Sequence, residues 1–462
     1  MTLIKSISGI RGTIGGRVGE NLTPPDVVRF AAAFGTWARQ QHTDTSVRTI
    51  VIGRDARTSG EAIAKLVAAT LQHLGLDVLD LGLSTTPTVE LAVAAEQEAA
   101  GGIIITASHN PGHWNALKLL NHHGEFISAA DGAAVLEIAE DQHLEYAPKV
   151  GTYTYDQTYL DKHIAAVLAL PLVDREAIAS RGFRVVVDAV NSSGGIAIPA
   201  LLRALGVSQV EEMFCEPTGV FAHNPEPLPE NLTQICSKMT SGDFDLGIVV
   251  DPDVDRLALI TEDGQAFGEE YTLVAVADYV LGRQGGGNTV SNLSSTQALR
   301  LITEKHGGTY TASAVGEVNV VQEMKAQQAI IGGEGNGGII YPALHYGRDA
   351  LVGIALFLSH LARFEGSATR LRSTYPNFYI AKKKIELTPD LDIENLLQGI
   401  QNKYQQQRIS TIDGVKIEFE NEWVHLRRSN TEPIIRIYAE SQNESTAEHL
   451  ANKLISDMKE MI

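Results

Sequence analysis

Cysteine, long apolar runs and excess basic charge are scarce in this 462-residue chain, and each scarcity excludes a class of protein. Only Cys215 and Cys236 are present, so a disulfide framework is excluded, and their spacing does not suit a metal site. The longest apolar helical stretch, residues 350–358, is too short to span a bilayer. Residues 1–6 lack the apolar core of a signal peptide. Together these features predict a cytoplasmic protein in a reducing compartment.

The charge balance is strongly acidic. Lysine and arginine total 37 whereas aspartate and glutamate total 56, which gives a formal net charge of −19. Nucleic acids and anionic membranes are bound by basic surfaces, so the sequence predicts neither as a partner. A phosphorylated small molecule stays open as a ligand, but its site must be built from a local cluster of basic side chains.

One pattern recurs three times along the chain: an apolar strand, a polar or glycine-rich turn, a helix, a glycine and a second strand. Gly75, Gly206 and Gly307 follow the three helices, as is usual where a helix ends. Strands that alternate with helices form α/β layers, so the sequence predicts three related α/β domains. The copies begin at residues 49–53, 183–187 and 288–290, and their helices are expected at residues 61–74, 196–205 and 296–306.

The C-terminal part of the chain has a different pattern. Since strands here adjoin strands, a small α+β domain is predicted. A linker to it is expected within residues 364–376, where Gly366, Ser367 and Pro376 interrupt the periodicity. Strands are expected at residues 378–387, 415–419, 423–426 and 434–438, and helices at residues 393–404 and 447–461.

The first chemical motif is a serine just beyond a buried strand. An apolar strand precedes Thr-Ala-Ser-His-Asn-Pro at residues 106–111. Pro111 disfavours helical geometry for the residue before it, so Ser108 is expected on a loop, at the strand end where α/β domains bind ligands. A hydroxyl there can carry a phosphoryl group, and His109 and Lys118 can supply positive charge or transfer protons. A polar turn with an N-cap serine is the structural alternative for this run alone.

The second motif is an acidic loop. Asp251, Asp253 and Asp255 alternate directly after an apolar strand, and Arg256 follows them. Alternating carboxylates can converge on a hard cation, and a Mg²⁺ ion that also binds a phosphate oxygen suits such a loop. An EF-hand is excluded because Arg256 stands where that loop requires glycine and residues 257–260 continue as a strand. A solvated acidic turn is less favoured, since three like charges repel one another unless a cation binds.

The third motif is glycine-rich: residues 332–338 hold five glycines around Glu334 and Asn336. Glycines let a backbone approach a ligand closely, and the two polar side chains offer acceptors and a donor that suit sugar hydroxyls. From this run alone, a flexible glycine hairpin is supported equally well.

The fourth motif, residues 427–433, is rich in hydrogen-bond donors. Arg427 is followed by Ser429 and Thr431, and Arg436 stands on the next predicted strand. Guanidinium groups bind phosphate through two parallel hydrogen bonds, and hydroxyls and turn N–H groups add further donors. This density of donors favours a phosphate site over an ordinary charged turn.

Three shorter features have simpler interpretations. Arg11, flanked by glycines near the N-terminus, is placed to approach an anion. The run at residues 53–60 is interpreted as an arginine–aspartate turn in which Ser59 or Thr58 caps the following helix. Asp349 directly precedes the apolar stretch and is interpreted as its N-cap.

Taken together and in this order, the four motifs resemble those of the α-D-phosphohexomutase family. The resemblance runs from Ser8 to Pro433 and into the last helix, and the serine loop, the Asp-x-Asp-x-Asp-Arg loop and Arg-x-Ser-Asn-Thr-Glu-Pro are highly specific in combination. It implies four domains: three share an α/β core, and the fourth is an α+β lid that resembles the TATA-binding protein. We expect these domains at residues 1–150, 151–257, 258–370 and 371–462.

The resemblance also implies an activity. The enzyme would interconvert a hexose 6-phosphate and a hexose 1-phosphate through a phosphoserine and a sugar 1,6-bisphosphate, which would also serve as activator. Lys118 would be the general base, and it could take the proton of the sugar hydroxyl if neighbouring cations lower its pKa. Ser108 would carry the phosphoryl group and bind Mg²⁺ together with Asp251, Asp253 and Asp255. Arg11, His109 and Arg256 would surround the transferring phosphate, Glu334 and Asn336 would bind the sugar, and the distal phosphate would be held by Arg427, Ser429, Asn430, Thr431 and Arg436.

Two departures from the family pattern bear on the substrate. Many bacterial members have Glu-x-Ser-Gly-His in the sugar loop, whereas this chain has Glu-Gly-Asn-Gly-Gly at residues 334–338 and so looks closer to archaeal-type members. Residues 112–118 replace the more usual Tyr-Asn-Gly-x-Lys and put the bulky Trp114 beside the site, while Lys118 keeps its spacing.

Several choices stay open at this level. Glucosamine 6-phosphate is the favoured phosphosugar by analogy with the family, and mannose and glucose phosphates are the alternatives. A phosphatase that uses the same serine and metal, and a non-catalytic sugar-phosphate binding protein, are the rival functions. The sequence does not determine the oligomeric state, so a homodimer is left open.

Overall fold

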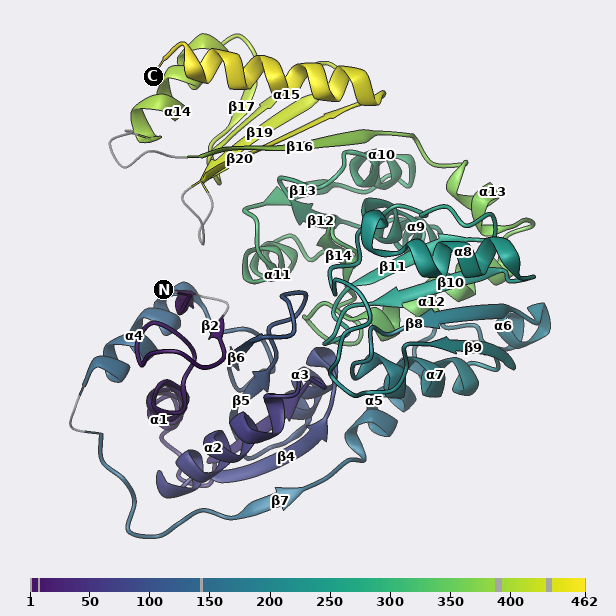
Figure 1. The fold of residues 1–462 in the computed structure, drawn as a ribbon. Helices are drawn as coiled ribbons and strands as arrows, with labels where there is room; N and C mark the ends of the chain where they lie inside the picture. Colours follow the sequence, from purple (N-terminus) through teal and green to yellow (C-terminus); the bar gives the residue numbers. More distant parts are fainter. Residues whose placement is uncertain (1, 7–8, 142–143, 387–392, 429–433, 462) are drawn as a thin grey trace.

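The computed structural model describes residues 2–6, 9–141, 144–386, 393–428 and 434–461, which form four sheets with helices packed against them. Each sheet is built from a successive part of the chain. In Figure 1 the first three sheets occupy the lower and middle parts of the view, and the C-terminal sheet lies at the top, with the last helix across its outer face.

The first sheet has seven strands in the order β1-β2-β6-β5-β3-β4-β7. Apolar side chains of α1 and α2 pack on it, with Phe30, Phe34 and Leu71 completely buried. The strands are β1 (Ile4–Ser6), β2 (Gly9–Thr13), β3 (Thr49–Arg54), β4 (Asp77–Leu83), β5 (Ala99–Ile105), β6 (Trp114–Leu120) and β7 (Tyr153–Tyr155). The helices are α1 (Pro24–Gln40), α2 (Gly60–His73), α3 (Thr86–Ala95) and α4 (Ala129–Glu140).

The second sheet has the order β11-β10-β8-β9, and the third has the order β13-β12-β14-β15. The second contains β8 (Arg184–Asp188), β9 (Gln209–Met213), β10 (Leu246–Val250) and β11 (Leu257–Thr261), with α5 (Tyr159–Leu168), α6 (Arg175–Arg181), α7 (Gly194–Ala204) and α8 (Thr233–Ser241). The third contains β12 (Thr289–Asn292), β13 (Tyr310–Ser313), β14 (Ile331–Glu334) and β15 (Gly338–Ile340), with α9 (Glu269–Gln284), α10 (Ala298–Lys305), α11 (Glu317–Ala326), α12 (Ala350–Arg363) and α13 (Ala368–Arg372).

These three sheets share one arrangement. In each, a central strand pairs in parallel with two neighbours, and one of those neighbours turns back as an antiparallel hairpin. The hairpins are β5–β6, β10–β11 and β14–β15. The serine loop, the acidic loop and the glycine-rich loop connect the two strands of these three hairpins, one in each sheet. The three related α/β domains predicted from the sequence are therefore present, and their motifs occupy equivalent positions.

The second and third sheets share a single apolar core. This core includes Val187 and Ile248 of the second sheet, Ile331 of the third, and both Leu351 and Leu358 of α12. Helix α12 contains residues 350–358, the apolar stretch that is too short to span a bilayer. These residues are buried in the core that the two sheets share. Among the described residues, no helix is long and apolar enough to cross a membrane.

The fourth sheet is antiparallel, with the order β16-β20-β19-β18-β17. Its own core joins the strands to the two helices, through residues such as Ile400, Val424 and Leu454. The strands are β16 (Tyr379–Glu386), β17 (Arg408–Ser410), β18 (Val415–Glu418), β19 (Trp423–Arg428) and β20 (Ile434–Ser441), and the helices are α14 (Ile393–Lys403) and α15 (Glu444–Lys459). The predicted α+β domain is confirmed.

The elements that the sequence predicts lie close to their expected ends, with three corrections. Gly75, Gly206 and Gly307 follow the three predicted helices with φ of 80°, 91° and 74°. The first two sheets run past the boundaries expected after residues 150 and 257, because β7 pairs with β4 and β11 pairs with β10. The expected linker contains α13, since Ser367 supplies an N-cap by accepting from the Arg370 N–H. The edge strand β17 has no counterpart in the prediction.

Candidate active site

Three loops from three sheets converge at one place. Ser108 Oγ donates a hydrogen bond to Asp251 Oδ2 at 2.8 Å, which joins the serine loop to the acidic loop. Arg348 donates to Asp255 Oδ2 at 2.7 Å and to Glu334 Oε2 at 2.8 Å, which joins the acidic loop to the glycine-rich loop. Motifs that are far apart in the sequence thus contact each other directly or are bridged by a single residue, Arg348.

The serine is held in an unusual backbone conformation. Ser108 has a φ of 50°, in the left-handed region that residues other than glycine adopt rarely. Its N–H donates to Thr106 Oγ1 at 2.9 Å, and this hydroxyl donates to Asp55 Oδ2 at 2.6 Å. Only 7% of Ser108 is exposed. The next element is the strand β6, so Ser108 is a loop residue that presents its hydroxyl to the acidic loop and is not an N-cap.

Arg57 explains why the serine loop keeps this shape. Its side chain is completely buried, and its Nε lies 3.0 Å from Asp55 Oδ2. Its two terminal nitrogens donate to four carbonyl oxygens of the serine loop at 2.6–2.9 Å, those of Ser108, Asn110, Pro111 and Trp114. The guanidinium group of Arg57 therefore holds the backbone of the serine loop at four carbonyl groups.

The predicted helix cap at Ser59 or Thr58 is wrong. Ser59 precedes α2, but its φ of −82° and ψ of −13° are helical and its side chain makes no capping hydrogen bond. A capping side chain usually requires an extended backbone at that residue. Ser59 Oγ accepts from Asn115 Nδ2 at 2.9 Å instead. The arginine–aspartate turn itself is present, and it supports the serine loop.

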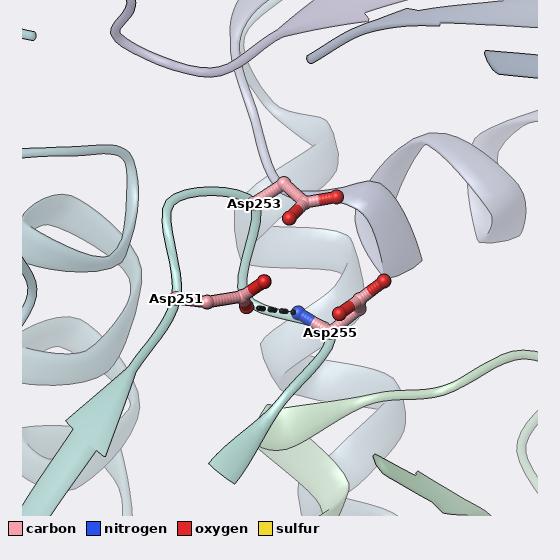
Figure 2. Close-up of side chains that lie close together, drawn as sticks. All are labelled: Asp251, Asp253 and Asp255. Carbon is pink, nitrogen blue, oxygen red and sulfur yellow. Dashed lines mark hydrogen bonds between the residues drawn. The ribbon is translucent and has the colours of Figure 1, made fainter. Parts of the chain in front are cut away.

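The acidic loop gathers three carboxylates in the interior. Asp251, Asp253 and Asp255 are all completely buried, and one oxygen from each lies within 4.8 Å of the others. Figure 2 shows the three side chains around a common space, with the Asp255 N–H donating to Asp251 Oδ1 at 3.2 Å. Burial, followed by the charges of the other two aspartates, raises the pKa of Asp251 well above its usual value. Such a cluster is stable in the ionised form only with a cation nearby.

Two oxygens of this cluster fit a metal ion. Asp253 Oδ1 and Asp255 Oδ1 are buried and have no hydrogen-bond partner among the described residues. Buried polar atoms without a partner are rare in folded proteins, so these two mark ligand positions. A set of carboxylate oxygens without sulfur or nitrogen suits a hard divalent cation. The Asp251–Asp253–Asp255 group can therefore hold a metal.

Lys118 lies against the acidic loop. Its Nζ is 2.7 Å from Asp253 Oδ2 and 3.4 Å from Asp255 Oδ2. Burial by itself would lower the pKa of Lys118, but the two carboxylates outweigh it and hold the pKa above its usual value. Likewise, Lys118 outweighs the effect of burial on Asp253 and lowers the pKa of that carboxyl. The condition for a lowered pKa of Lys118, a set of neighbouring cations, is not met among the described residues, because its nearest charges are carboxylates.

His109 and Arg256 lie beside the serine. His109 Nδ1 is 3.4 Å from Ser108 Oγ. Burial, reinforced by the charge of Arg256, lowers the pKa of His109 well below its usual value, so the ring is neutral near pH 7. Glu226 lies 3.8 Å from Arg256 and 4.0 Å from His109. His109 can thus exchange a proton, but it does not supply positive charge.

A cavity of about 860 Å³ opens beside this cluster. Five lysine and arginine side chains of the described residues line it: Arg11, Arg256, Lys382, Arg427 and Arg436. Burial, and then the charge of Arg436, lowers the pKa of Arg11, so cations from the first and fourth sheets lie within electrostatic reach of one another. In a chain with a net charge of −19, this is the local basic cluster that a phosphorylated ligand requires.

The glycine-rich loop is the turn of the β14–β15 hairpin and also lines the cavity, through Glu334 and Asn336. Only 5% of Glu334 is exposed. Its Oε1 accepts from Asn292 Nδ2 at 2.8 Å and from the Gly316 N–H at 3.2 Å, and its Oε2 is bound by Arg348. The run is therefore a glycine hairpin and part of the cavity wall at once, and its carboxylate is held firmly by the protein.

The predicted distal phosphate site is only partly described. Arg427 and Arg436 lie on β19 and β20 and line the cavity, and Arg427 Nε is 3.2 Å from Asp413 Oδ2. Ser429, Asn430 and Thr431 lie outside the described residues. Trp114 lines the cavity, as expected from its position beside the serine loop.

Several residues of the site have no counterpart in the sequence interpretation. Lys382, Glu269 and Glu270 line the cavity, and Arg348 joins two loops. Lys382 had a usable signal, because it begins a run of three lysines on a predicted strand. Arg348 precedes Asp349, whose predicted N-cap is confirmed by its hydrogen bonds from the first turn of α12. Nothing local marks Arg348 itself, because its partners are remote in the sequence.

Comparison with known families accounts for the whole chain. Four families match in order, described as alpha/beta/alpha domains I, II and III and the C-terminal domain of phosphoglucomutase/phosphomannomutase. The matches cover residues 4–145, 158–264, 268–378 and 384–456. Each match contains most of one of the four sheets, while β7 and the first half of β16 lie outside the matched residues.

Similar proteins extend over nearly the full length. The "Phosphoglucomutase/phosphomannomutase" of Thermococcus kodakarensis is 34% identical over 441 residues, which are 94% of this chain and 95% of the relative. The "Probable phosphoglucosamine mutase" of Methanopyrus kandleri is 31% identical over 460 residues, or 98% and 97% of the two chains. A solved phosphoglucomutase/phosphomannomutase family protein from Burkholderia thailandensis has 26% identity and a TM-score of 0.86, and covers 99% of this chain and 98% of its own.

The sequence motifs, the repeated hairpin arrangement and the four domain matches all follow the same order along the chain. No part of the comparison depends on a single motif, since the relatives are matched from end to end. This chain therefore belongs to the phosphoglucomutase/phosphomannomutase family and is a phosphohexomutase, an isomerase of carbohydrate metabolism.

Proposed function

We propose that this phosphohexomutase interconverts glucosamine 6-phosphate and glucosamine 1-phosphate through a phosphorylated Ser108 and a sugar 1,6-bisphosphate. The observation that carries the proposal is the 2.8 Å hydrogen bond from Ser108 to Asp251, beside a cavity lined by five lysine and arginine side chains. The choice of glucosamine is supported by relatives with that name, such as the one from Methanopyrus kandleri. Glucose and mannose phosphates are the alternatives, supported by the name of the Thermococcus kodakarensis relative.

Mg²⁺ is the cofactor we propose for Asp251, Asp253 and Asp255, with phosphorylated Ser108 as a further ligand. Two buried oxygens without a hydrogen-bond partner among the described residues, Asp253 Oδ1 and Asp255 Oδ1, support this assignment. When bound, the ion would offset the charge of the phosphoserine and stabilise charge on the transferring phosphoryl group.

Repulsion between two phosphates is the main electrostatic problem of the reaction. A phosphoserine carries about −1.5 to −2 charges, and two unit charges roughly 4 Å apart repel by about 4 kcal/mol at an effective dielectric constant of about 20. We assign Arg11 and Arg256 to reduce this repulsion around the transferring group. Neutral His109 lies close enough to Ser108 Oγ to exchange its proton.

Lys118 is the general base we propose for the sugar hydroxyl. A general base must be uncharged when it accepts a proton. Asp253 and Asp255 hold the proton on Lys118 in the free protein. Lys118 can therefore act as a base only when these carboxylates are engaged elsewhere.

The remaining cavity residues bind the rest of the substrate. Glu334 and Asn336 are proposed to bind sugar hydroxyls, and the distal phosphate to be held by Arg427, Ser429, Asn430, Thr431 and Arg436, with Lys382 as an addition. The bisphosphate must turn end for end before its second phosphate returns to Ser108, so the distal site has to accept either end of the sugar. A sugar 1,6-bisphosphate is then needed to prime any dephosphorylated enzyme.

Mass spectrometry and turnover by Ser108→Ala test this function. We expect a phosphoryl adduct on Ser108 of the purified protein, and no isomer formation by Ser108→Ala even with sugar 1,6-bisphosphate supplied. Retained mutase activity in that variant would exclude the phosphoserine cycle. Phosphate release faster than isomer formation would favour a phosphatase, and neither a phosphoserine nor turnover would favour a binding protein. The kcat/KM values for glucosamine, glucose and mannose phosphates decide the sugar.

A further inference from the structure

Four carboxylates of the described residues line the cavity, and only one of them has no ion-pair partner among these residues. Three are paired: Glu226 with Arg256 at 3.8 Å, Glu269 with Lys382 at 2.5 Å, and Glu334 with Arg348 at 2.8 Å. The fourth is Glu270. No lysine, arginine or histidine within the described part of the chain lies at ion-pairing distance from its carboxylate. A negative charge on the Glu270 carboxylate can therefore be balanced by a cationic group of a ligand.

Glu270 is built into the glycine-rich loop. It lies in the first turn of α9, and its Oε2 accepts from the Thr296 N–H at 2.8 Å. A Cβ atom added to Gly335 would lie only 2.1–2.3 Å from the two oxygens and the carbon of this carboxyl group. The carboxyl group thus occupies the place of a side chain at residue 335, between Glu334 and Asn336. It stands where the sugar is proposed to bind.

The surrounding protein groups do not favour a charge on Glu270. Burial raises the pKa of Glu270 well above its usual value, and the charge of Lys382 opposes this without overcoming it. Lys382 is already engaged by Glu269. A buried carboxylate is stabilised when a ligand brings a cation to it, because the ion pair offsets the loss of hydration.

We propose that Glu270 is a subsite for the ammonium group of an amino-sugar phosphate. This inference rests on the proposed function and deepens it, because it names a residue that separates a 2-amino sugar from its 2-hydroxy counterpart. An ammonium group donates a charge-assisted hydrogen bond to a carboxylate, which is stronger than the bond from a neutral hydroxyl. Glucose phosphates lack the cation and gain much less from Glu270.

Glu269 provides a matched control. It is adjacent in the sequence and lines the same cavity, but its carboxylate already has the cationic partner Lys382. Glu269→Gln removes the same charge at nearly the same place. Its effect on an amino sugar and on a neutral sugar should therefore be similar, whereas the effect of Glu270→Gln should differ between them.

The experiment compares kcat/KM for glucosamine 6-phosphate and glucose 6-phosphate, with the full-length protein in Mg²⁺ and sugar 1,6-bisphosphate. In Glu270→Gln we expect kcat/KM to fall about tenfold for glucosamine 6-phosphate and by less than about threefold for glucose 6-phosphate. In Glu269→Gln the ratio of the two values should stay within about threefold of the wild-type ratio. Equal losses on both sugars in Glu270→Gln would overturn the subsite and make Glu270 a structural partner of Thr296.

If Glu270→Gln does not fold, the wild-type protein still tests the subsite. The wild-type protein should turn over glucosamine 6-phosphate with a higher kcat/KM than glucose 6-phosphate, and a preference for glucose would overturn the subsite. Such a preference would also replace glucosamine by glucose in the proposed function. Failure of the mutase activity itself has a different signature: no isomer is formed from any sugar phosphate, and the subsite falls with it. Equal losses in Glu270→Gln, by contrast, leave the mutase activity itself intact.

Discussion

Arg348 donates a hydrogen bond to Asp255 at 2.7 Å, and this contact ties the acidic loop to the segment that precedes α12. The same guanidinium lies 2.8 Å from Glu334 and 3.1 Å from Glu317. Space for it comes from Gly338, because a Cβ atom there would lie 2.3 Å from Arg348 Cδ. This glycine is thus coupled to an arginine that joins two functional loops.

Arg348→Met should therefore reduce both stability and activity. Removing one partner of a buried ion pair leaves the other charge uncompensated, at a cost of about 3–5 kcal/mol. Arg348→Lys should recover part of the loss, because it keeps the charge but cannot bind three carboxylates in the same geometry. Urea unfolding and kcat/KM at saturating Mg²⁺ measure the two effects. A methionine variant as stable and active as the wild type would contradict this assignment.

Arg203→Met serves as the control for Arg348. Arg203 pairs with Glu212, but its side chain is 64% exposed. Exposed ion pairs contribute about 0–1 kcal/mol, so this variant should remain close to the wild type in both measurements.

Arg57→Met should lower kcat far more than it changes KM. Arg57 does not line the cavity, and its partners are carbonyl groups of the serine loop. Loss of these bonds leaves several buried carbonyls unsatisfied and allows Ser108 to leave its φ of 50°. We expect a fall in kcat of about a hundredfold, since misplacement by about 1 Å can cost that much. The fraction of Ser108 phosphorylated, read by intact mass, should fall in parallel.

The neighbouring Arg54 gives the comparison for Arg57. Its side chain is half-buried and donates one hydrogen bond, to the Asp55 carbonyl at 3.3 Å. Arg54→Met should leave kcat within about threefold of the wild-type value, because no bond to the serine loop is lost. A similar fall in kcat in both variants would show that Arg57 has no special positioning role.

The sequence predicted what depends on short-range patterns. Apolar strands, glycine helix ends and the serine and aspartate motifs are local, and the structure has them where the sequence places them. The contacts of Arg57 and Arg348 were not predicted, because their partners are remote in the sequence. Ser108 is 51 residues from Arg57, and Asp255 is 93 residues from Arg348. Such residues come together only in the folded chain, so no local sequence pattern predicts their contacts.

Charge states were the least predictable part of the site. His109 was expected to supply positive charge or to transfer protons, and burial, which keeps it neutral, leaves only the second role. Lys118 would need neighbouring cations to lower its pKa, yet it lies against Asp253 and Asp255. Both outcomes depend on desolvation and on neighbours from other loops, which a sequence does not specify. Glu270 is a similar case, since its proposed role depends on the lack of an ion-pair partner among the described residues, which a sequence does not reveal.

Removal of divalent cations should abolish turnover and lower the melting temperature. A ligand that binds only the folded state stabilises it, by about 2.7 kcal/mol at a concentration of about 100 Kd. Asp253→Asn should weaken Mg²⁺ binding by at least about tenfold, because one of three charged ligands is lost. Titration calorimetry and melting curves with and without MgCl₂ measure this. Asp243→Asn, at an 89% exposed side chain, should bind Mg²⁺ like the wild type. A melting temperature that does not respond to Mg²⁺ would contradict the metal site.

His425 makes the contact between the third and fourth sheets sensitive to acid. Its ring is 1% exposed, its Nδ1 lies 2.9 Å from Ser294 Oγ, and its Nε2 donates to the Asp413 carbonyl at 2.6 Å. Burial lowers the pKa of His425 to about 4, from an ordinary value of 6.5. Between these pH values the unfolded chain holds more protons than the folded protein. The stability from the neutral ring is therefore complete above pH 6.5 and is lost as the pH falls through about 4.

His425→Gln should flatten this pH dependence. At ~1.36 kcal/mol per pKa unit, the wild type loses roughly 3 kcal/mol from this group between neutral pH and pH 4, and a glutamine cannot titrate. Urea unfolding at a series of pH values should therefore show a steeper loss in the wild type than in the variant. His449→Gln removes an exposed histidine from the same domain and should keep the wild-type slope. Equal slopes for the wild type and His425→Gln would mean that acid acts on this contact through other groups.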